Sequence, residues 1–366
     1  MKNISAKEHM RRALALAKKA EGRTSPNPMV GAVIVKNGLT LSEGYHKKAG
    51  LPHAEIEALK KAGNEARGAD LYVNLEPCCH QGRTGPCVEA IIKSGIRRVF
   101  VGMRDPNPLV YGKGIRALKK SAIQVTTGIL RAECRQLNEI FIKFTGSGKP
   151  FVILKSAISL DGKIAASSGE SKWISGPRSR QLTHQVRDRV DAIMVGAGTV
   201  LKDDPLLTAR LKNRKGENPI RVILDNGCRI PLSRKVFSNA AADRVIYVAS
   251  EKISAARKKQ LRRMGVELCV MKEKRGGVNL PQLMKYLGDR DITSVLLEGG
   301  SELSASALRE KIVDKIMFFV APIIIGGKQS PSVVAGLGAA RLKDAWKIHN
   351  LTAKQIGKDF LLEGYL

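Results

Sequence analysis

Short apolar segments of the kind that form buried strands alternate with helical patterns along most of this chain. The first run contains MVGAVIVKNG, DLYVNLEP and RRVFVGM, and a second run extends from FVILKSAIS to KIMFFVAPIIIGG. Such regular alternation predicts a layered α/β sheet with helices on its faces. We therefore expect the functional residues to lie at strand ends.

The alternation is interrupted at FTGSGKP (Phe144 to Pro150), where Gly, Ser and Pro end a helical pattern. A chain of 366 residues is also longer than a usual single core of roughly 100–200 residues. The sequence therefore predicts two α/β domains, at residues 1–146 and 150–366, with their boundary in this segment.

Composition narrows the class of protein. Hydrophobic residues make up 43% and charged residues 26% of the chain, which is a globular balance. The N-terminal segment reads as an amphipathic surface helix, and no apolar run reaches about 18 residues, so we expect a cytoplasmic protein with no membrane partner. The six cysteines are too sparse for a disulfide framework, and a thiolate site in a reducing compartment is the better interpretation.

The chain carries 63 basic and 33 acidic residues, a formal charge of +30, which raises the question of a nucleic-acid partner. The basic residues are scattered over helical surfaces, however, and aromatic residues are only 4% of the chain. Few aromatic side chains are therefore available to stack on nucleic-acid bases. We expect solvated basic faces that attract phosphorylated small molecules, and no dedicated nucleic-acid site.

A metal-binding pattern lies in the first half. His53 and Glu55 come just before a helical run, and EPCCHQGRTGPC follows further along the chain. Zinc deaminases carry His-x-Glu followed by Pro-Cys-x-x-Cys, and their Glu moves protons without binding the metal. Pro77 and Cys78 match this pattern, but the next cysteine after the Cys78–Cys79 pair is Cys87, across a longer loop.

Adjacent residues rarely point the same way, so Cys79 is not expected to share the ion with Cys78. We predict a zinc site with His53, Cys78 and Cys87 as ligands and an open position for water. Glu55 would then relay protons between that water and a leaving amine.

Four stretches in order, SPNPMVGAVIV, HAEIEAL, EPCCHQGRTGPC and GMRDPNP, resemble the deaminase half of the bifunctional riboflavin-biosynthesis deaminase-reductases. The longer loop between the cysteines is a feature of that family, although Ser is usual where Cys79 stands. The resemblance implies a three-layer, cytidine-deaminase-like domain that deaminates 2,5-diamino-6-ribosylamino-4(3H)-pyrimidinone 5′-phosphate. It also implies the following substrate contacts: Asn27, His80, Arg83, Thr84, Asp105 and Asn107.

In the second half, glycines follow apolar strands at GAGTV (Gly196 to Val200) and EGGSEL (Glu298 to Leu303). Glycine at such a turn lets backbone amides approach a phosphate at a helix N-terminus. Each signal alone is weak, and neither is the full dinucleotide-binding fingerprint.

Together with KSAISLDGKIA, SKWISG and VGAGTVLKDDPLLTAR, these turns resemble the reductase half of the same family, which has a dihydrofolate-reductase-like α/β fold. That resemblance implies reduction of the ribosyl group to ribityl by NADPH. We predict that Lys155 and Glu298 lie near the reacting sugar carbon. The implied cofactor contacts are Ala157, Trp173, Thr199, Asp203, Gly300, Ser301, Glu302, Leu303, Ser304, Ala305 and Ser306. The implied substrate contacts are Ser171, Arg187, Leu207, Arg210 and Glu298.

Two other interpretations remain open at this stage. One is a nucleic-acid-editing zinc deaminase with a basic accessory domain, whose affinity would fall steeply with salt. The other is a basic nucleic-acid-binding protein with a purely structural zinc, in which His80 or Cys79 would complete the ligand set. The family resemblance instead implies a small phosphorylated pyrimidine as partner and a homo-oligomer, either a dimer or a tetramer.

Overall fold

The computed structural model describes residues 5–80, 85–274 and 276–366. The chain forms two compact units, Met1–Gly148 (unit 1) and Lys149–Leu366 (unit 2), whose boundary lies in the segment that links the two alternating patterns. The hydrophobic core of unit 1 and the two core clusters of unit 2 are each built from residues of one unit.

Unit 1 is built on a five-stranded sheet of order β2-β1-β3-β4-β5. β1 is antiparallel to both of its neighbours, whereas β3, β4 and β5 are parallel to one another. The strands are β1 (Gly31–Lys36), β2 (Leu39–Tyr45), β3 (Asp70–Leu75), β4 (Arg98–Met103) and β5 (Gln124–Thr127).

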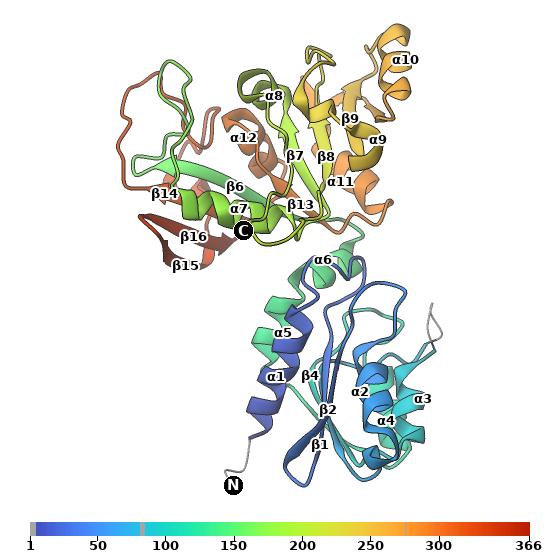
Figure 1. The fold of residues 1–366 in the computed structure, drawn as a ribbon. Coiled ribbons are helices and arrows are strands. Elements are labelled where there is room, and N and C mark those ends of the chain that lie inside the picture. Colours follow the sequence, from blue (N-terminus) through green and yellow to red (C-terminus); the bar gives the residue numbers. More distant parts are fainter. Residues whose placement is uncertain (1–4, 81–84, 275) are drawn as a thin grey trace. The chain divides into compact units, whose positions relative to one another are not determined.

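Helices cover both faces of this sheet (Figure 1). On one face lie α1 (Ala6–Lys18) and α5 (Arg131–Leu137), and on the other lie α2 (Ala54–Ala62), α3 (Cys87–Lys93) and α4 (Lys113–Lys120). A 3₁₀ turn, η1 (Gly63–Ala66), follows α2, and α6 (Glu139–Ser147) follows α5. The predicted three-layer arrangement is confirmed.

Strand β2 was not expected from the sequence. Its first two residues are exposed, the others alternate between partly buried and buried positions, and several side chains are polar, so it lacks the apolar run that marked the other strands. The hairpin that joins it to β1 turns at Asn37 and Gly38, which have φ values of 52° and 81°. Asn-Gly is the preferred pair for a two-residue hairpin turn because both positions need positive φ.

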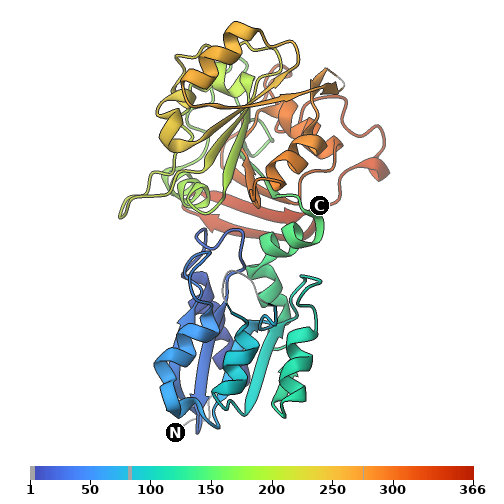
Figure 2. The ribbon, with the colours of Figure 1, turned by 90° about the vertical axis from the view of Figure 1, so that its right-hand side faces the viewer.

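Unit 2 contains a nine-stranded sheet of order β10-β9-β8-β7-β13-β6-β14-β16-β15 (Figure 2). The strands from β10 to β14 in this order are parallel, and β16 and β15 add an antiparallel edge. The strands are β6 (Phe151–Ser159), β7 (Ala192–Gly196), β8 (Ile220–Leu224), β9 (Val245–Ser250), β10 (Glu267–Met271), β13 (Ser294–Leu297), β14 (Lys315–Ala321), β15 (His349–Ile356) and β16 (Asp359–Tyr365), with a separate pair β11 (Glu273–Lys274) and β12 (Gly277–Val278).

Successive residues of the central strands enter different core clusters. Met194 belongs to one cluster, while Ile193 and Val195 belong to the other, so this part of the sheet is buried on both faces, as parallel sheets are.

The helices of unit 2 are α7 (Pro177–Arg187), α8 (Ala197–Asp203), α9 (Ala240–Asp243), α10 (Ala255–Arg263), α11 (Leu280–Gly288) and α12 (Ser301–Arg309), with 3₁₀ turns η2 (Lys235–Phe237) and η3 (Leu342–Asp344). None of the helices within the described residues has the length and hydrophobicity needed to cross a bilayer.

Candidate functional site

Three potential metal ligands converge in unit 1 from separate parts of the chain. His53 precedes α2, Cys78 follows β3 by a few residues, and Cys87 opens α3. The imidazole nitrogen and the two sulfurs all lie within 4.8 Å of one another. Imidazole plus thiolates at this separation is a donor set that fits zinc.

Local structure explains why these side chains face one another. His53 occupies the N-cap position of α2 but makes no capping hydrogen bond, so its ring is directed at the sulfurs instead. Its Nδ1 lies 3.2 Å from Cys87 Sγ and 3.5 Å from Cys78 Sγ. The backbone N–H of Cys87 donates to Cys78 Sγ at 3.3 Å.

The Cys78 thiol is set up to bind as a thiolate. Its hydrogen bond with Cys87 and its contact with His53 together lower the pKa of Cys78 to about 4, against the opposing effect of burial. The thiolate is the form of cysteine that ligates metals.

Glu55 lies in the first turn of α2, two residues after His53, and its side chain is buried. Burial raises the pKa of Glu55 to about 7, and Cys78 adds to the rise while His53 opposes it. A carboxyl group that titrates near neutrality can accept a proton in one step and donate it in the next.

Neither Cys79 nor His80 joins the three ligands among the described residues. Cys79 Sγ instead lies 4.0 Å from the carbonyl oxygen of Leu109, and the buried Nδ1 of His80 has no hydrogen-bond partner within this part of the chain. The arrangement therefore favours three protein ligands and an open fourth position over a closed structural zinc site.

The expected substrate residues of unit 1 lie in loops of its sheet. Asn27 Nδ2 lies 3.1 Å from His46 Nε2. Asp105 is buried, which raises its pKa to about 6, and its Oδ1 accepts a hydrogen bond from the Asn107 backbone at 2.8 Å. Two further expected contacts, Arg83 and Thr84, lie outside the described residues.

Glu76 is a structural support that sequence reasoning missed. Its buried carboxylate accepts backbone N–H bonds from Asp105 at 3.2 Å, Gly112 at 3.0 Å and Ile115 at 3.1 Å. These bonds connect the segment before Cys78 to the loop that carries Asp105. The Glu-Pro-Cys order was visible in the sequence, but nothing there indicated which backbone groups the Glu would meet.

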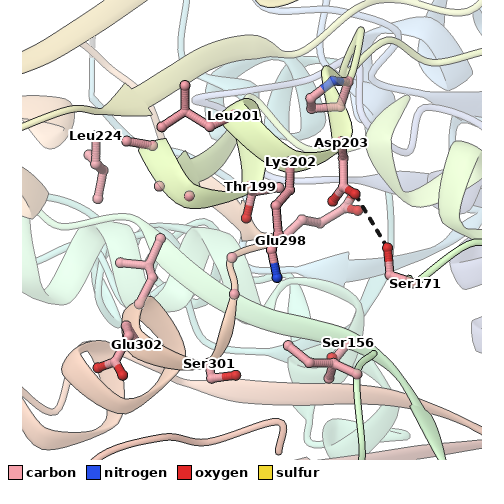
Figure 3. A pocket seen from close by; sticks show the side chains of 18 of the residues that line it. Ser156, Ser171, Thr199, Leu201, Lys202, Asp203, Leu224, Glu298, Ser301 and Glu302 are labelled. Atoms are coloured by element: carbon pink, nitrogen blue, oxygen red, sulfur yellow. Dashed lines mark hydrogen bonds between the residues drawn. The ribbon is translucent and has the colours of Figure 1, made fainter. Parts of the chain in front are cut away.

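Unit 2 contains a cavity of about 1290 Å³. It is lined by residues of β6, α7, α8 and α12, among them Lys155, and by the loops after β6 and α8. Figure 3 shows Thr199 and Lys202 of α8 on one side of the cavity and Ser301 and Glu302 of α12 on another. Asp203, at the end of α8, accepts a hydrogen bond from Ser171, with an Oγ to Oδ1 distance of 3.3 Å, and this bond is dashed at the right of Figure 3.

Glu298, directly after β13, has two cationic partners. Arg187 at the end of α7 donates from Nε to Oε1 at 2.7 Å and from Nη2 to Oε2 at 2.9 Å. Lys155 Nζ lies 3.4 Å from Oε2. Burial alone would raise the pKa of Glu298, but Arg187 and Lys155 outweigh it and lower the pKa to about 2. One carboxylate therefore holds an Arg and a Lys in fixed positions at the cavity wall.

Glycines precede both helices that open toward the cavity. Gly196 is the N-cap of α8 and Gly300 is the N-cap of α12, and neither helix has a side-chain cap. Their first backbone N–H groups are therefore not capped by a side chain of the N-cap residue, which suits the binding of a phosphate.

Most of the reductase residues predicted from the sequence line this cavity, and two do not. Ser304 and Ala305 are buried on α12 and are not among its lining residues. The predicted residues that line the cavity are Lys155, Ala157, Ser171, Trp173, Arg187, Thr199, Asp203, Leu207, Arg210, Glu298, Gly300, Ser301, Glu302, Leu303 and Ser306.

Other lining residues were not singled out from the sequence, among them His184, Lys202 and Ser156. His184 Nδ1 lies 3.2 Å from the carbonyl oxygen of Thr208. Burial lowers the pKa of His184 to about 4, and Arg187 and Arg210 add to this effect. Lys202 could have been found from its spacing, because it lies one helical turn after Thr199.

Family models match both units. Residues 4–103 match the cytidine and deoxycytidylate deaminase zinc-binding region, and residues 150–362 match the RibD C-terminal domain. The riboflavin biosynthesis protein RibD of Actinobacillus pleuropneumoniae is 42% identical over 99% of this chain and 96% of its own length. RibD of Escherichia coli is 36% identical over 97% of each chain.

Solved structures agree over the whole length. RibD of Acinetobacter baumannii superposes with a TM-score of 0.88 at 37% identity and covers 98% of both chains. A Thermotoga maritima protein, described as a diaminohydroxyphosphoribosylaminopyrimidine deaminase/5-amino-6-(5-phosphoribosylamino)uracil reductase, superposes with a TM-score of 0.87 at 39% identity, also over 98% of both. The chain therefore belongs to the RibD family of bifunctional deaminase-reductases of riboflavin biosynthesis, with a zinc-binding deaminase domain followed by a reductase domain.

Proposed function

We propose that unit 1 deaminates a diaminohydroxyphosphoribosylaminopyrimidine and that unit 2 reduces the resulting 5-amino-6-(5-phosphoribosylamino)uracil. In the first reaction water is added at the ring carbon that bears the amine, the C–N bond breaks, and ammonia leaves. In the second, the ribosyl group gains a hydride and a proton and opens to ribityl. The domains would be residues 1–146 and 150–366.

In the deaminase, His53, Cys78 and Cys87 would hold zinc, which when bound makes a water molecule nucleophilic. Glu55 would take the proton from that water and give it to the departing amine, since its pKa near neutrality suits both steps. Asn27, His80, Asp105 and Asn107 would orient the pyrimidine, with Arg83 and Thr84 as predicted phosphate contacts.

In the reductase, bound NADPH supplies the hydride. Lys155 would place its ammonium group near the sugar oxygen that becomes a hydroxyl, and Glu298 would hold that ammonium and the Arg187 guanidinium in place. The predicted cofactor contacts on α8 and α12 would orient the nicotinamide nucleotide, and Ser171, Leu207 and Arg210 would contact the sugar phosphate.

One observation carries the deaminase assignment: three donor atoms within 4.8 Å of one another lie beside a buried carboxyl group with a raised pKa. The full-length likeness to RibD proteins favours this assignment over a nucleic-acid-editing deaminase, which was the main alternative. A purely structural zinc would leave Glu55 without a role.

The test supplies the diaminopyrimidine phosphate with and without NADPH and follows ammonia release and NADPH absorbance separately. Glu55→Gln should retain zinc and lose ammonia release by several orders of magnitude, because the amide cannot relay protons. Lys155→Ala should release ammonia at the wild-type rate but oxidise NADPH slowly.

Full ammonia release by Glu55→Gln would exclude the proposed proton relay. Absence of NADPH oxidation by the wild-type protein, even when it is given the deaminated intermediate, would exclude the reductase assignment. Each activity is therefore tested without reliance on the other.

We further propose that the protein works in the cytoplasm as a homo-oligomer, either a dimer or a tetramer. A reducing compartment suits the six cysteines, all of which are free thiols in this structure. Sedimentation analysis of the zinc-loaded protein tests the oligomer, and a purely monomeric species would contradict it.

A further inference from the structure

His46 lies in unit 1 between an expected substrate residue and an expected zinc ligand. Its side chain is buried, with 2% exposed. Its Nε2 lies 3.1 Å from Asn27 Nδ2 and its Nδ1 lies 3.1 Å from the carbonyl oxygen of Pro52. The His46 and His53 rings meet edge to face, with centroids 5.3 Å apart.

These two contacts determine which ring nitrogen carries the proton. The Pro52 carbonyl can only accept a hydrogen bond, so Nδ1 must donate to it. In the neutral imidazole the other ring nitrogen, Nε2, then carries only a lone pair and can only accept a hydrogen bond. Both contacts are satisfied together by one neutral form of His46, with the proton on Nδ1.

The same hydrogen bonds determine how the Asn27 amide is turned. If Asn27 were reversed, its oxygen would face the lone pair of Nε2, and two acceptors would oppose each other at 3.1 Å. With the amide nitrogen facing His46, Asn27 Oδ1 is left without a hydrogen-bond partner among the described residues.

We propose that His46 is a positioning residue that holds Asn27 with its oxygen available to the substrate, so that the deaminase selects a heterocycle edge that carries an N–H donor. The identity of the substrate in this inference rests on the proposed deaminase function. The protonation of the His46 ring does not depend on that function. A ligand that offers only an acceptor at this edge would face Oδ1 and bind weakly, because neither acceptor would be satisfied.

Two substitutions separate the two hydrogen bonds of His46. In His46→Gln the side-chain oxygen reaches the place of Nε2, so it can still accept from Asn27. In His46→Asn the side-chain nitrogen reaches the place of Nδ1, so it can still donate to the Pro52 carbonyl. Nothing then accepts the hydrogen bond from Asn27 at the place of Nε2. The pair therefore tests orientation of Asn27 against a general packing role.

The first measurement does not depend on activity. In the full-length, zinc-loaded protein with ¹⁵N-labelled histidine, two-bond ¹H–¹⁵N spectra report which ring nitrogen is protonated, and the chain has only six histidines. The His46 signal is identified as the one that is absent from the spectrum of His46→Gln. In the wild-type spectrum this signal should show a proton on Nδ1 and no proton on Nε2. A proton on Nε2 would overturn the proposal, whatever substrate the enzyme uses.

The second measurement is steady-state ammonia release. We expect His46→Asn to raise KM by about tenfold with a smaller change in kcat, the effect of losing roughly one buried hydrogen bond. His46→Gln should stay within about threefold of wild type, and both variants should retain zinc. In an Asn27→Ala background the two His46 substitutions should no longer differ.

Equal KM values for the Gln and Asn variants, or an undiminished difference in the Asn27→Ala background, would overturn the positioning role. A wild-type protein that releases no ammonia would instead refute the proposed function, and the spectra would still decide the protonation of His46. The two failures are therefore distinguishable.

Discussion

Glu298 shows how strongly one buried carboxylate depends on its neighbours. Its side chain is 11% exposed, and those of Arg187 and Lys155 are 13% and 14% exposed. The two cations exceed its single negative charge, so the group as a whole favours an additional anion. A phosphorylated substrate would supply that anion, and we propose that the cluster then serves in binding as well as in folding.

The lowered pKa of Glu298 predicts a pH dependence of stability. Its pKa is about 2 in the folded protein, against an ordinary value of 4.5, so the folded state binds this proton less tightly than the unfolded state does. The resulting stabilisation is fully present above pH 4.5 and is lost as the pH falls toward 2. Its size is on the order of 3 kcal/mol.

Glu298→Gln isolates this contribution because the amide cannot titrate. Both tryptophans, Trp173 and Trp346, lie in unit 2, so their fluorescence during denaturant unfolding reports on that unit. The variant should be less stable than wild type by about 3 kcal/mol near neutral pH, since two cations lose their buried partner. The difference should shrink as the pH falls below 4.5, and a pH-independent difference would contradict the assignment.

At the level of elements, α1 packs directly on β1 at Gly31. A Cβ placed on Gly31 would lie 2.0 Å from the carbonyl oxygen of Ala13 and 2.8 Å from the backbone nitrogen of Ala17. Both atoms belong to the backbone of α1, which cannot move without disturbing the outer helical layer.

We therefore expect Gly31→Ala to destabilise unit 1 by at least about 2 kcal/mol, as overpacking does. The matched control is Gly146→Ala in α6, where a Cβ would meet no atom within 4 Å, and where Ala should be neutral or slightly stabilising. Circular dichroism of thermal unfolding measures both. Similar melting temperatures for the two variants would mean that the helix does not approach the strand as closely as described.

At the scale of the whole molecule, each unit has its own hydrophobic core, and the zinc ligands all belong to unit 1. Metal binding should therefore stabilise unit 1 alone, because a ligand stabilises only the folded state that binds it. Removal of zinc with a chelator should lower the melting temperature of unit 1 by several degrees.

The transition followed by tryptophan fluorescence, which belongs to unit 2, should stay where it is after chelation. Re-addition of zinc provides the control, since it should restore the transition of unit 1. A shift of both transitions by the same amount would show that the two units unfold as one cooperative body.

Some features followed from the sequence because they depend on local chemistry. The apolar segments predicted the buried strands, since strand residues buried on both faces must nearly all be apolar. His53, Cys78 and Cys87 were recognisable because few residue types bind zinc and a deaminase also needs Glu55 close by. Strand β2 was missed because a half-exposed edge strand needs few apolar residues.

Tertiary structure decided the rest. The hydrogen bonds of Glu76 and His46 join residues that are far apart in the chain or join a side chain to a backbone group. A pattern of residue types in the sequence does not predict such contacts. Likewise, Glu298 acquires its low pKa only because the fold brings Arg187 at the end of α7 and Lys155 in the middle of β6 to it. Residue types therefore specified which chemistry this protein could perform, whereas folding specified which groups lie within hydrogen-bonding distance, because electrostatic and hydrogen-bond energies fall steeply with separation.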